Sequence, residues 1–497
     1  MAECDPHGYY AALKSRDARF DGRFFVGVSS TKIYCRPICR ARLPKEENCT
    51  FFSTAAEAEQ AGYRPCLLCR PELAPGRSVM DATASLAHRA TRLLEEDCGS
   101  GQSLERLAGR LGCTDRHLRR VFAEEYHVSP VQYVQTCKLL MAKSLLTDTD
   151  LPISDVALTA GFGSLRRFND LFKKRYRLSP SRFRKEASNR TECQNEITLK
   201  LGYRPPYRWR ELIEFLAMRA IPGVEAVRDG AYLRTVRLLA DEGKEARGWI
   251  RVTNDEKKSV LNVTLSSTLL PSVPQVLARV RHLFDLQSDP DAVGEVLSSM
   301  NGLKPGLYVP GMRVPGCFDA FETTVRAVLG QQITVKAAGT LAGRMVDAYG
   351  TPLETGIEGL IHLFPTPEGI VNLGEPISDR LGPLGIIATR SETIRALARA
   401  FVQGSIDFSP SAQPETETRK LRALPGIGAW TAQYIAMRVM GWPDAFLETD
   451  HGVKKALFPR TSREIRDLAE AWHPWRSYAT VNLWNSLTEP NSSLNSH

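Results

Sequence analysis

The most constraining feature of this sequence is a set of four cysteines in two close pairs. Cys35 stands with Cys39, and Cys66 stands with Cys69, at the ends of a longer intervening loop. A C-x3-C pair followed by a C-x2-C pair is the spacing of a tetrahedral zinc site with four thiolate ligands. We therefore expect a small domain built around one Zn²⁺ ion held by four cysteines.

Arginines surround these cysteines. Zinc with four thiolates carries a net charge of about −2, so a cationic setting for it indicates a surface that can also take phosphate. A purely structural zinc site is the alternative that spacing alone leaves open. The arginines are Arg36, Arg40, Arg42, Arg64 and Arg70.

The residues around the cysteines, Tyr34–Arg42 and Gly62–Pro71, carry a specific motif. It resembles the N-terminal domain of the Ada family of DNA alkylation-repair proteins, over about residues 1–80. The resemblance implies that Cys35 is a metal-activated nucleophile that accepts a methyl group from a methylphosphotriester in DNA. Cys39, Cys66 and Cys69 would complete the zinc site. The same resemblance implies contacts with the DNA backbone at Thr31, Arg40, Arg42 and Arg64.

Methylation of Cys35 would change the charge of the site, because a thiolate becomes a neutral thioether. Facing DNA phosphates, the loss of one negative charge should strengthen binding. One pair of unit charges at about 4 Å is worth on the order of 1 kcal/mol in water and about 4 kcal/mol at a dielectric near 20. The chemistry therefore predicts a switch in DNA affinity of roughly tenfold or more.

The composition fits a cytoplasmic, multidomain protein. The chain has 497 residues, which predicts three or four domains, and 43% of them are hydrophobic and 24% charged. It has no run of 18 apolar residues and no secretory pattern at the N-terminus, so we expect no membrane partner. The net charge of +9 suits a polyanionic partner.

Residues 84–187 predict an all-helical domain with an internal repeat. Ser103 and Thr114 are placed to cap two helices, and the same pattern returns about 50 residues later. Two such units resemble the AraC/XylS-type double helix-turn-helix DNA-binding domain. The residues we expect to face the DNA grooves are Arg116, His117, Arg119, Arg166, Arg167 and Asn169.

Residues 186–196 are predicted to form a linker, and residues 197–300 an α+β domain with an antiparallel sheet. We expect strands at 197–201, 232–236, 248–252 and 260–265, and helices at 209–219 and 274–284. No catalytic cluster is evident in this region, so we interpret it as a scaffold.

Residues 301–490 are again helical and contain Leu424-Pro425-Gly426-Ile427-Gly428. This pattern predicts a helix-hairpin-helix whose exposed backbone N–H groups bind a DNA phosphate through Gly426 and Gly428. With the Gly/Pro-rich loop ending at Asp450, residues 197–490 resemble the 3-methyladenine DNA glycosylase II (AlkA-type) branch of the helix-hairpin-helix glycosylases. The resemblance implies that Asp450 is the catalytic carboxylate. It also implies aromatic pocket walls at Trp430, Tyr434 and Trp484.

Several departures refine this assignment. Trp430 stands where lyase-competent relatives place lysine, so strand cleavage is not expected, and the lack of cysteines after Cys317 excludes a C-terminal iron–sulfur cluster. Gln331-Gln332 stands where the relatives place an apolar wedge. No Pro-Cys-His-Arg segment occurs, so repair of O6-alkylguanine is not predicted.

The sequence thus predicts a multidomain α+β protein with a zinc domain (1–80), a double helix-turn-helix domain (84–187), an α+β domain (197–300) and a helix-hairpin-helix glycosylase domain (301–490). Its function would be methyl transfer to Cys35 with transcriptional activation, plus excision of alkylated purines through Asp450. Two alternatives stay open: a regulator whose glycosylase half only binds DNA, and a repair enzyme tethered by its helix-turn-helix part. The expected partners are alkylated and promoter double-stranded DNA and RNA polymerase, for a nucleoid-associated monomer.

Overall fold

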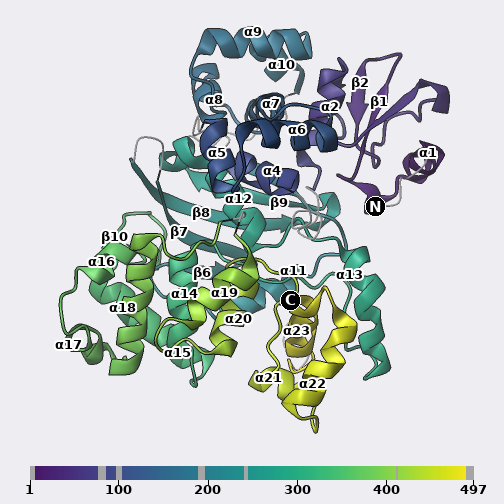
Figure 1. Ribbon diagram of the computed structural model, residues 1–497. Coiled ribbons are helices and arrows are strands. Elements are labelled where there is room, and N and C mark those ends of the chain that lie inside the picture. The colour runs from purple at the N-terminus through teal and green to yellow at the C-terminus, as the bar shows by residue number, and fades with distance from the viewer. Residues whose placement is uncertain are drawn as a thin grey trace. The chain divides into compact units, whose positions relative to one another are not determined.

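A computed structural model describes residues 6–75, 86–96, 103–187, 196–239, 244–409 and 412–488. The chain divides into two compact units (Figure 1). Unit 1 comprises Met1–Pro205, Leu233–Arg281 and Leu286–Ser288, and unit 2 comprises Pro206–Tyr232, His282–Asp285 and Asp289–His497. Within the described ranges, no helix combines the length and the apolar character that crossing a bilayer requires.

A four-stranded sheet at the start of unit 1 carries the first cysteine pair. Its order is β3-β1-β2-β4, and β4 runs parallel to β2 while the other pairs are antiparallel. Because alternate residues of a strand face opposite sides, Val26 packs with Leu13 of α1 while Phe25 packs with Ala58 of α2. The bounds are α1 Pro6–Ser15, β1 Phe25–Val28, β2 Ile33–Cys35, β3 Cys49–Phe52, α2 Ala55–Gln60 and β4 Arg64–Pro65.

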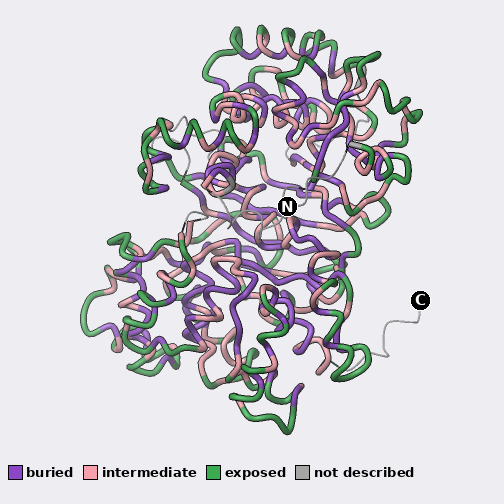
Figure 2. Tube along the Cα trace, turned by 45° about the vertical axis from the view of Figure 1, so that its right-hand side comes forward, coloured by how far each residue is buried: buried purple, intermediate pink, exposed green. Residues whose placement is uncertain are grey.

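The helical part of unit 1 repeats itself, as predicted. The buried residues Leu118, Phe122 and Tyr126 of α6 are matched by Phe168, Phe172 and Tyr176 of α9, each numbered 50 higher. This i, i+4, i+8 spacing gives each helix one buried face, and Figure 2 shows buried and exposed segments alternating along the chain. The bounds are α4 Leu86–Glu96, α5 Leu104–Arg110, α6 Asp115–Tyr126, α7 Pro130–Asp148, α8 Ile153–Thr159, α9 Leu165–Tyr176 and α10 Pro180–Ala187.

The helix ends of the two halves also match. Thr114 and Ser164 cap α6 and α9 with their side-chain oxygens, and both helices end at a residue in the left-handed region, His127 and Arg177. The Ser-Pro steps begin the following helices: Ser129 is the N-cap of α7, with the proline at the first helical position.

The predicted antiparallel sheet is present, with one strand more than expected. Its order is β5-β9-β8-β7-β6. Along β5 every second residue, Ile197, Leu199 and Leu201, is buried. The four predicted strands are confirmed as β5 Glu196–Gly202, β7 Ala231–Leu239, β8 Glu245–Asp255 and β9 Val260–Ser266, and the short β6 Glu225–Arg228 is additional. Most of the predicted linker at 186–196 lies outside the described residues.

Unit 2 is largely helical around one apolar core that includes Phe321, Val325, Leu397 and Ile435. The helices of unit 2 include α11 Trp209–Ala217, α14 Ala320–Leu329, α19 Pro414–Arg422, α20 Ala429–Arg438, α21 His451–Ala456, α22 Ser462–Ala469 and α23 Arg476–Asn485. The unit also includes α13 Pro290–Leu297, α15 Val335–Tyr349, β10 Thr351–Pro352, β11 His362–Leu363, α16 Pro367–Val371, α17 Ser378–Leu381 and α18 Ala388–Gln403. The helix α12, Val273–Leu283, belongs to unit 1 as far as Arg281.

Candidate metal centre and aromatic pocket

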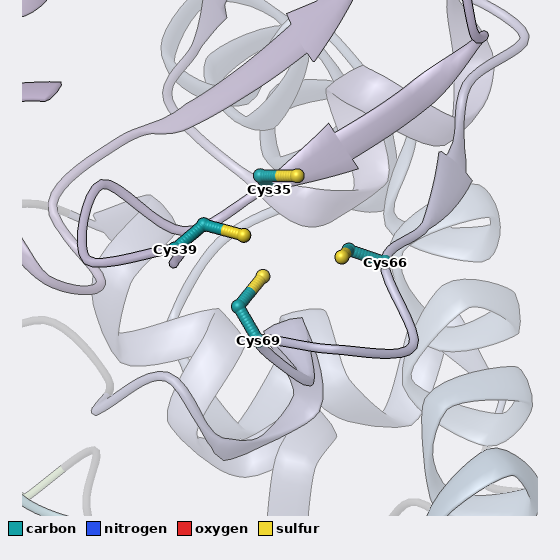
Figure 3. Close-up of side chains that lie close together, drawn as sticks. All are labelled: Cys35, Cys39, Cys66 and Cys69. Atoms are coloured by element: carbon teal, nitrogen blue, oxygen red, sulfur yellow. The ribbon is translucent and has the colours of Figure 1, made fainter. Parts of the chain in front are cut away.

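The small sheet brings the four predicted cysteines together. Cys35 ends β2, and Cys39 follows a turn in which its N–H donates to the Arg36 carbonyl at 3.1 Å. Cys66 follows β4, and its N–H donates to the Tyr34 carbonyl at 3.0 Å. Figure 3 shows the four sulfurs turned toward a common centre. The parallel pairing of β2 with β4 therefore joins the two cysteine pairs.

The sulfur positions fit one zinc ion. All four Sγ atoms lie within 4.8 Å of one another. Zinc–sulfur bonds of about 2.3 Å in a tetrahedron separate the sulfurs by about 3.8 Å. Thiolates this close would repel one another without a cation between them. The donor set therefore matches the predicted Cys4 zinc site.

Cys35 lines a groove of about 640 Å³, together with Cys39 and Cys66. Taken as a whole residue, Cys35 is half-buried, whereas Cys39 and Cys66 are each 7% exposed. Of the predicted DNA contacts, Thr31 and Arg42 also line the groove, whereas Arg40 and Arg64 do not. Of the described residues that line it, none is acidic.

The groove also holds two cations that the sequence did not indicate, Lys14 and Arg16. Both lie at the end of α1 and are exposed, and neither has an acidic partner among the described residues. Arg16 adopts a left-handed backbone conformation, with φ of 52°. In the sequence, Lys14 and Arg16 resemble ordinary charged residues at the solvent-exposed end of a helix. Only the folded structure shows that they line the groove.

Two arginines expected to face phosphate are instead held inside the protein, which corrects the sequence interpretation. Arg36 is 8% exposed; its Nε donates to Asp21 at 2.8 Å and its Nη1 to the Cys69 carbonyl at 3.1 Å. Arg70 donates to both oxygens of Asp148 on α7, at 2.7 and 2.6 Å. These arginines fix the metal-binding segment rather than extend its surface.

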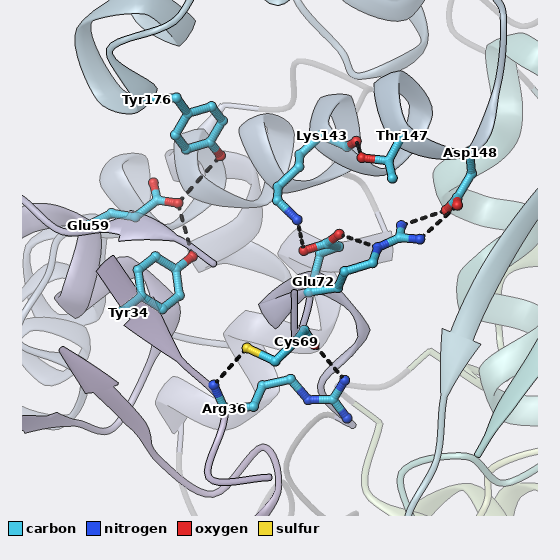
Figure 4. Close-up of polar contacts among 10 residues, drawn as sticks. Tyr34, Arg36, Glu59, Cys69, Glu72, Lys143, Thr147, Asp148 and Tyr176 are labelled. Carbon is cyan, nitrogen blue, oxygen red and sulfur yellow. Dashed lines mark hydrogen bonds and ion pairs between the residues drawn. The ribbon is translucent and has the colours of Figure 1, made fainter. Parts of the chain in front are cut away.

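A buried ion pair between Glu72 and Lys143 adds to the contacts that hold the metal-binding segment (Figure 4). Glu72 accepts a hydrogen bond from Arg70 at 2.9 Å and pairs with Lys143 of α7, and the Lys143 and Glu72 side chains are only 1% and 2% exposed. Burial opposes the charge of Glu72, but Lys143 and Arg70 lower the pKa of its carboxyl. The segment that follows Cys69 is thus tied to a helix of the helix-turn-helix part.

A second buried acid makes a different set of contacts. Glu59 of α2 accepts hydrogen bonds from the hydroxyls of Tyr34 at 3.2 Å, Thr136 at 3.3 Å and Tyr176 at 3.5 Å. Arg175 lies 3.9 Å from its carboxylate. Burial raises the pKa of Glu59 to about 7 despite these partners.

The predicted DNA-facing residues of the two helix-turn-helix halves differ in their pairing. On α6, Arg119 donates to Asp115 at 3.0 Å, while Arg116 and His117 are exposed. On α9, Arg166 and Arg167 are exposed and have no acidic partner in the described part of the chain; Asn169 is half-buried. Two of the three predicted positions on α9 are therefore unpaired cations.

Asp450 stands at the start of α21, between two tryptophans. Its Oδ1 accepts hydrogen bonds from the Val453 N–H at 3.0 Å and from Trp484 Nε1 at 2.8 Å. Its Oδ2 accepts from Trp430 Nε1 at 3.1 Å. All three donors are uncharged, so the carboxylate is oriented without an ion pair.

Aromatic rings continue from this carboxylate on both sides. Trp430 stacks on Tyr434 with ring centroids 5.2 Å apart, and Trp484 stacks on Phe215 at 6.1 Å. The guanidinium of Arg219 lies 3.6 Å from the centre of the Phe215 ring. The structure therefore brings together all three predicted pocket residues.

Phe215 of α11 and Arg219, which follows that helix, belong to the region that we interpreted as a scaffold, and the structure brings both beside Trp484. Phe215, Arg219 and Trp484 line one cavity of about 180 Å³. An aromatic residue on an amphipathic helix is indistinguishable from a core residue by sequence pattern alone. The contact between Phe215 and Trp484 joins residues that are far apart in the sequence, so the local sequence pattern does not predict it.

Tyr434 adjoins two guanidinium groups. Arg438, which is 4% exposed, donates from Nη1 to the Tyr434 hydroxyl at 2.9 Å. Burial opposes ionisation of the phenol, but the charges of Arg438 and Arg219 outweigh it and lower the pKa of Tyr434 to about 8.

The predicted hairpin between α19 and α20 is formed. Gly426 has φ of +78°, and a Cβ at this position would lie 2.0 Å from the Thr393 hydroxyl, so both conformation and space require glycine. Gly428 is exposed at the start of α20. Gln331 donates to the Gly426 carbonyl at 2.9 Å, which leaves Gln332, exposed and with φ of 55°, as the free member of the polar pair.

Family models match the chain in four consecutive segments. They are described as the metal binding domain of Ada (residues 8–72), a helix-turn-helix domain (107–186), the AlkA N-terminal domain (198–319) and the HhH-GPD superfamily base excision DNA repair protein (325–473). The resemblances seen in the sequence, and the multidomain fold class, are confirmed. Together with the four sulfurs, the first match supports one Zn²⁺ ion bound by cysteines.

Three relatives illustrate how the chain is composed. A probable bifunctional transcriptional activator/DNA repair enzyme AlkA of Mycobacterium tuberculosis is 36% identical over 490 residues, covering 97% of this chain and 96% of the relative. DNA-3-methyladenine glycosylase 2 of Escherichia coli is 37% identical over 57% of this chain and 95% of its own length. The activator/repair enzyme AdaA of Bacillus subtilis is 32% identical over 35% of this chain and 81% of its own length.

Proposed function

Since the chain belongs to the family of bifunctional transcriptional activator/DNA repair enzymes of the AlkA type, we propose that it joins two alkylation repair reactions to a transcriptional response. Cys35 accepts methyl groups from DNA methylphosphotriesters, and Asp450 directs the excision of alkylated purines. The observation that carries the proposal is the assembly of Asp450, Trp430, Tyr434 and Trp484 at one point of the fold.

The reaction at Cys35 is a displacement at carbon. The sulfur attacks the methyl carbon, an S–C bond forms, the C–O bond of the triester breaks, and a phosphodiester anion leaves. Zinc, when bound, keeps the four sulfurs deprotonated at neutral pH. Cys35 lines the groove beside Thr31 and Arg42, which hold the flanking phosphates, and Arg40 and Arg64 add contacts outside the groove.

Transfer of one methyl group removes one negative charge from the cysteine site. Lys14, Arg16 and Arg42 in the same groove then face the DNA phosphates with less opposing charge. DNA affinity rises, and the helix-turn-helix halves place the protein at its promoter. The contacts there come from Arg116, His117 and Arg119 on α6 and from Arg166, Arg167 and Asn169 on α9. Activation proceeds through RNA polymerase, with the protein acting as a monomer on nucleoid DNA in the cytoplasm.

The reaction at Asp450 breaks an N-glycosidic bond. As the cationic base leaves with the bonding electrons, positive charge develops at C1′, and the carboxylate stabilises it and orients the attacking water. Trp430, Tyr434 and Trp484 contact the base through stacking and cation–π interaction, worth about 0.5–2 kcal/mol. Gly426 and Gly428 hold the DNA phosphate. Trp430 offers no amine for a Schiff base, so the glycosylase is monofunctional.

The test uses one methylated DNA duplex and two variants of the full chain. We expect mass spectrometry to find one added methyl group on the peptide that contains Cys35, and chromatography to find free 3-methyladenine. Cys35→Ala should abolish only the first product, and Asp450→Asn should slow release of only the second, by about 10²–10³-fold. Methyl uptake by Cys35→Ala would overturn the first assignment, and base release by Asp450→Asn at close to the wild-type rate would overturn the second.

A further inference from the structure

Gly452 provides the space through which Trp484 reaches Asp450. A Cβ at Gly452 would lie 2.8 Å from Trp484 Cδ1 and 3.1 Å from both Trp484 Nε1 and Asp450 Oδ1. Its backbone is not in the left-handed region, so conformation alone does not require glycine. The requirement comes from the indole lying directly against the first turn of α21.

The indole has little freedom to move away from an added side chain. Its ring stacks on Phe215, with an interplanar angle of 16°. It is carried by α23, in which every residue from Ser477 to Leu483 is buried. A displaced indole would therefore lose its 2.8 Å hydrogen bond to Asp450 rather than shift together with it.

The other end of α23 is attached to the loop that leads to Asp450. Asp444, 7% exposed, accepts hydrogen bonds from Arg476 through both oxygens, with Nε at 2.8 Å from Oδ1, and lies 2.9 Å from His473. The Ser477 N–H donates to the Pro443 carbonyl at 2.9 Å. The loop and the helix are thus joined at Asp444, at Ser477 and at Asp450.

We propose that Gly452 and the Asp444–Arg476 pair are positioning residues for the excision reaction. They hold α23 against the loop that leads to Asp450. In this position the Trp484 N–H donates to Oδ1 of Asp450 while the Trp430 N–H donates to Oδ2. A displacement of about 1 Å at a reacting group can cost about 100-fold in rate. This inference rests on the proposed excision at Asp450.

The first test is Gly452→Ala, with Gly339→Ala in α15 as the matched control, because a Cβ at Gly339 meets only the Ala220 carbonyl at 4.0 Å. We expect Gly452→Ala to lower the single-turnover excision rate about 100-fold while binding to DNA with an uncleavable abasic site changes less than about twofold. Gly339→Ala should excise at the wild-type rate. An excision rate for Gly452→Ala within about twofold of wild type would overturn the role of Gly452.

The second test separates positioning from folding at Arg476. Arg476→Met should lower the excision rate constant about tenfold with little change in KM, and Arg476→Lys should recover part of it by donating to one oxygen of Asp444. The control is Arg466→Met, which breaks a 3.2 Å pair with Glu448 in the same loop. Equal rates in Arg476→Met and Arg466→Met, or no recovery with lysine, would overturn the role of the pair.

Asp450→Asn distinguishes a failure of the positioning role from a failure of the proposed excision reaction. Normal rates in the Gly452 and Arg476 variants, with release slowed about 10²–10³-fold in Asp450→Asn, would remove the positioning role alone. Base release by Asp450→Asn at close to the wild-type rate would remove both the positioning role and the proposed excision.

Discussion

The zinc centre and the aromatic pocket differ in the partners that surround their carboxylates. Around the cysteines, the buried acids Asp21, Glu72 and Asp148 are each paired with a cation. Around Asp450, the donors are two indoles and one backbone amide, and no ion pair to this carboxylate occurs within the described residues. These three acids near the cysteines are thus neutralised by cations, whereas Asp450 receives hydrogen bonds from uncharged donors alone among the described residues.

This difference suits the two proposed substrates. A methylphosphotriester lies between anionic phosphates, so its site benefits from unopposed cations such as Arg42 and from acids that are neutralised. An alkylated purine is itself cationic, so its site benefits from a carboxylate whose charge is not quenched. The comparison shows that a carboxylate can be held in place without being neutralised, when uncharged N–H groups supply the hydrogen bonds.

The largest expected effect comes from removing Lys143, one of the two cations paired with Glu72. Lys143→Met leaves a buried carboxylate with one partner fewer and should lower the free energy of unfolding by about 3–5 kcal/mol, measured by urea denaturation. Lys45→Met is the control, because its 3.5 Å pair with Glu47 is exposed and should contribute less than about 1 kcal/mol. Equal losses in the two variants would contradict the role assigned to burial.

Removing the charge of Asp450 tests the other side of the comparison. Asp450→Asn keeps the shape of the side chain and should lower the excision rate about 10²–10³-fold, or about 3–4 kcal/mol in barrier height. Methyl transfer to Cys35 and the folded state should be unaffected. Glu448→Gln, two residues earlier, should retain nearly full excision in the same single-turnover assay.

Glu59 adds a third case to the comparison, because it is a buried acid whose charged form is not fully stabilised by its hydrogen-bond partners. Its pKa of about 7 in the folded protein exceeds the ordinary value of 4.5, so the folded state binds the proton more tightly than the unfolded state. Stability is then lost as the pH rises from about 4.5 to 7. Glu59→Gln should remove this loss and stabilise the protein at pH 8 by about 2–3 kcal/mol relative to wild type.

Denaturation at pH 5 and at pH 8 provides the measurement for Glu59. The variant and the wild type should differ little at pH 5, where the wild-type side chain is protonated in the folded protein. A variant that is less stable than wild type at both pH values would show that the carboxylate is favourable in its charged form.

The smallest expected effect compares the two halves of the helix-turn-helix part. Arg166→Ala removes an unpaired cation and should weaken promoter binding by about 1 kcal/mol or more, whether it contacts phosphate or base. Arg119→Ala removes a cation already paired with Asp115 at 3.0 Å and should cost less. Titrations at several salt concentrations would measure both affinities. A greater loss in Arg119→Ala would contradict the larger contribution expected of the unpaired Arg166.

Local patterns in the sequence predicted those parts of the fold that repeat or that need a particular spacing. The four cysteines, the caps at Thr114 and Ser164, and the hairpin glycines each occupy positions where the chemistry or the backbone allows few residue types. The strands near 197 and 260 followed from alternation of apolar residues. The predicted metal ligands were brought together, and so were Asp450 and its aromatic neighbours; their roles stay predictions.

The rest depended on contacts between distant segments. Arg36 and Arg70 looked like surface cations, and only the positions of Asp21 and Asp148 show that they are internal. Neither Phe215 nor Gly452 was singled out from the sequence. In each case the residue type is common, and what distinguishes it is a neighbour many residues away.

Cys35 is both a ligand of the metal site and the proposed acceptor of the methyl group, and this double use limits how often each molecule can act. In the proposed reaction the product is a thioether, which cannot accept a second methyl group, so each protein molecule would repair one methylphosphotriester and stay methylated. The proposed excision would instead release its product and turn over. A single polypeptide would then combine a single-use methyl acceptor, whose methylated form accumulates with the damage met, and a catalyst that acts repeatedly.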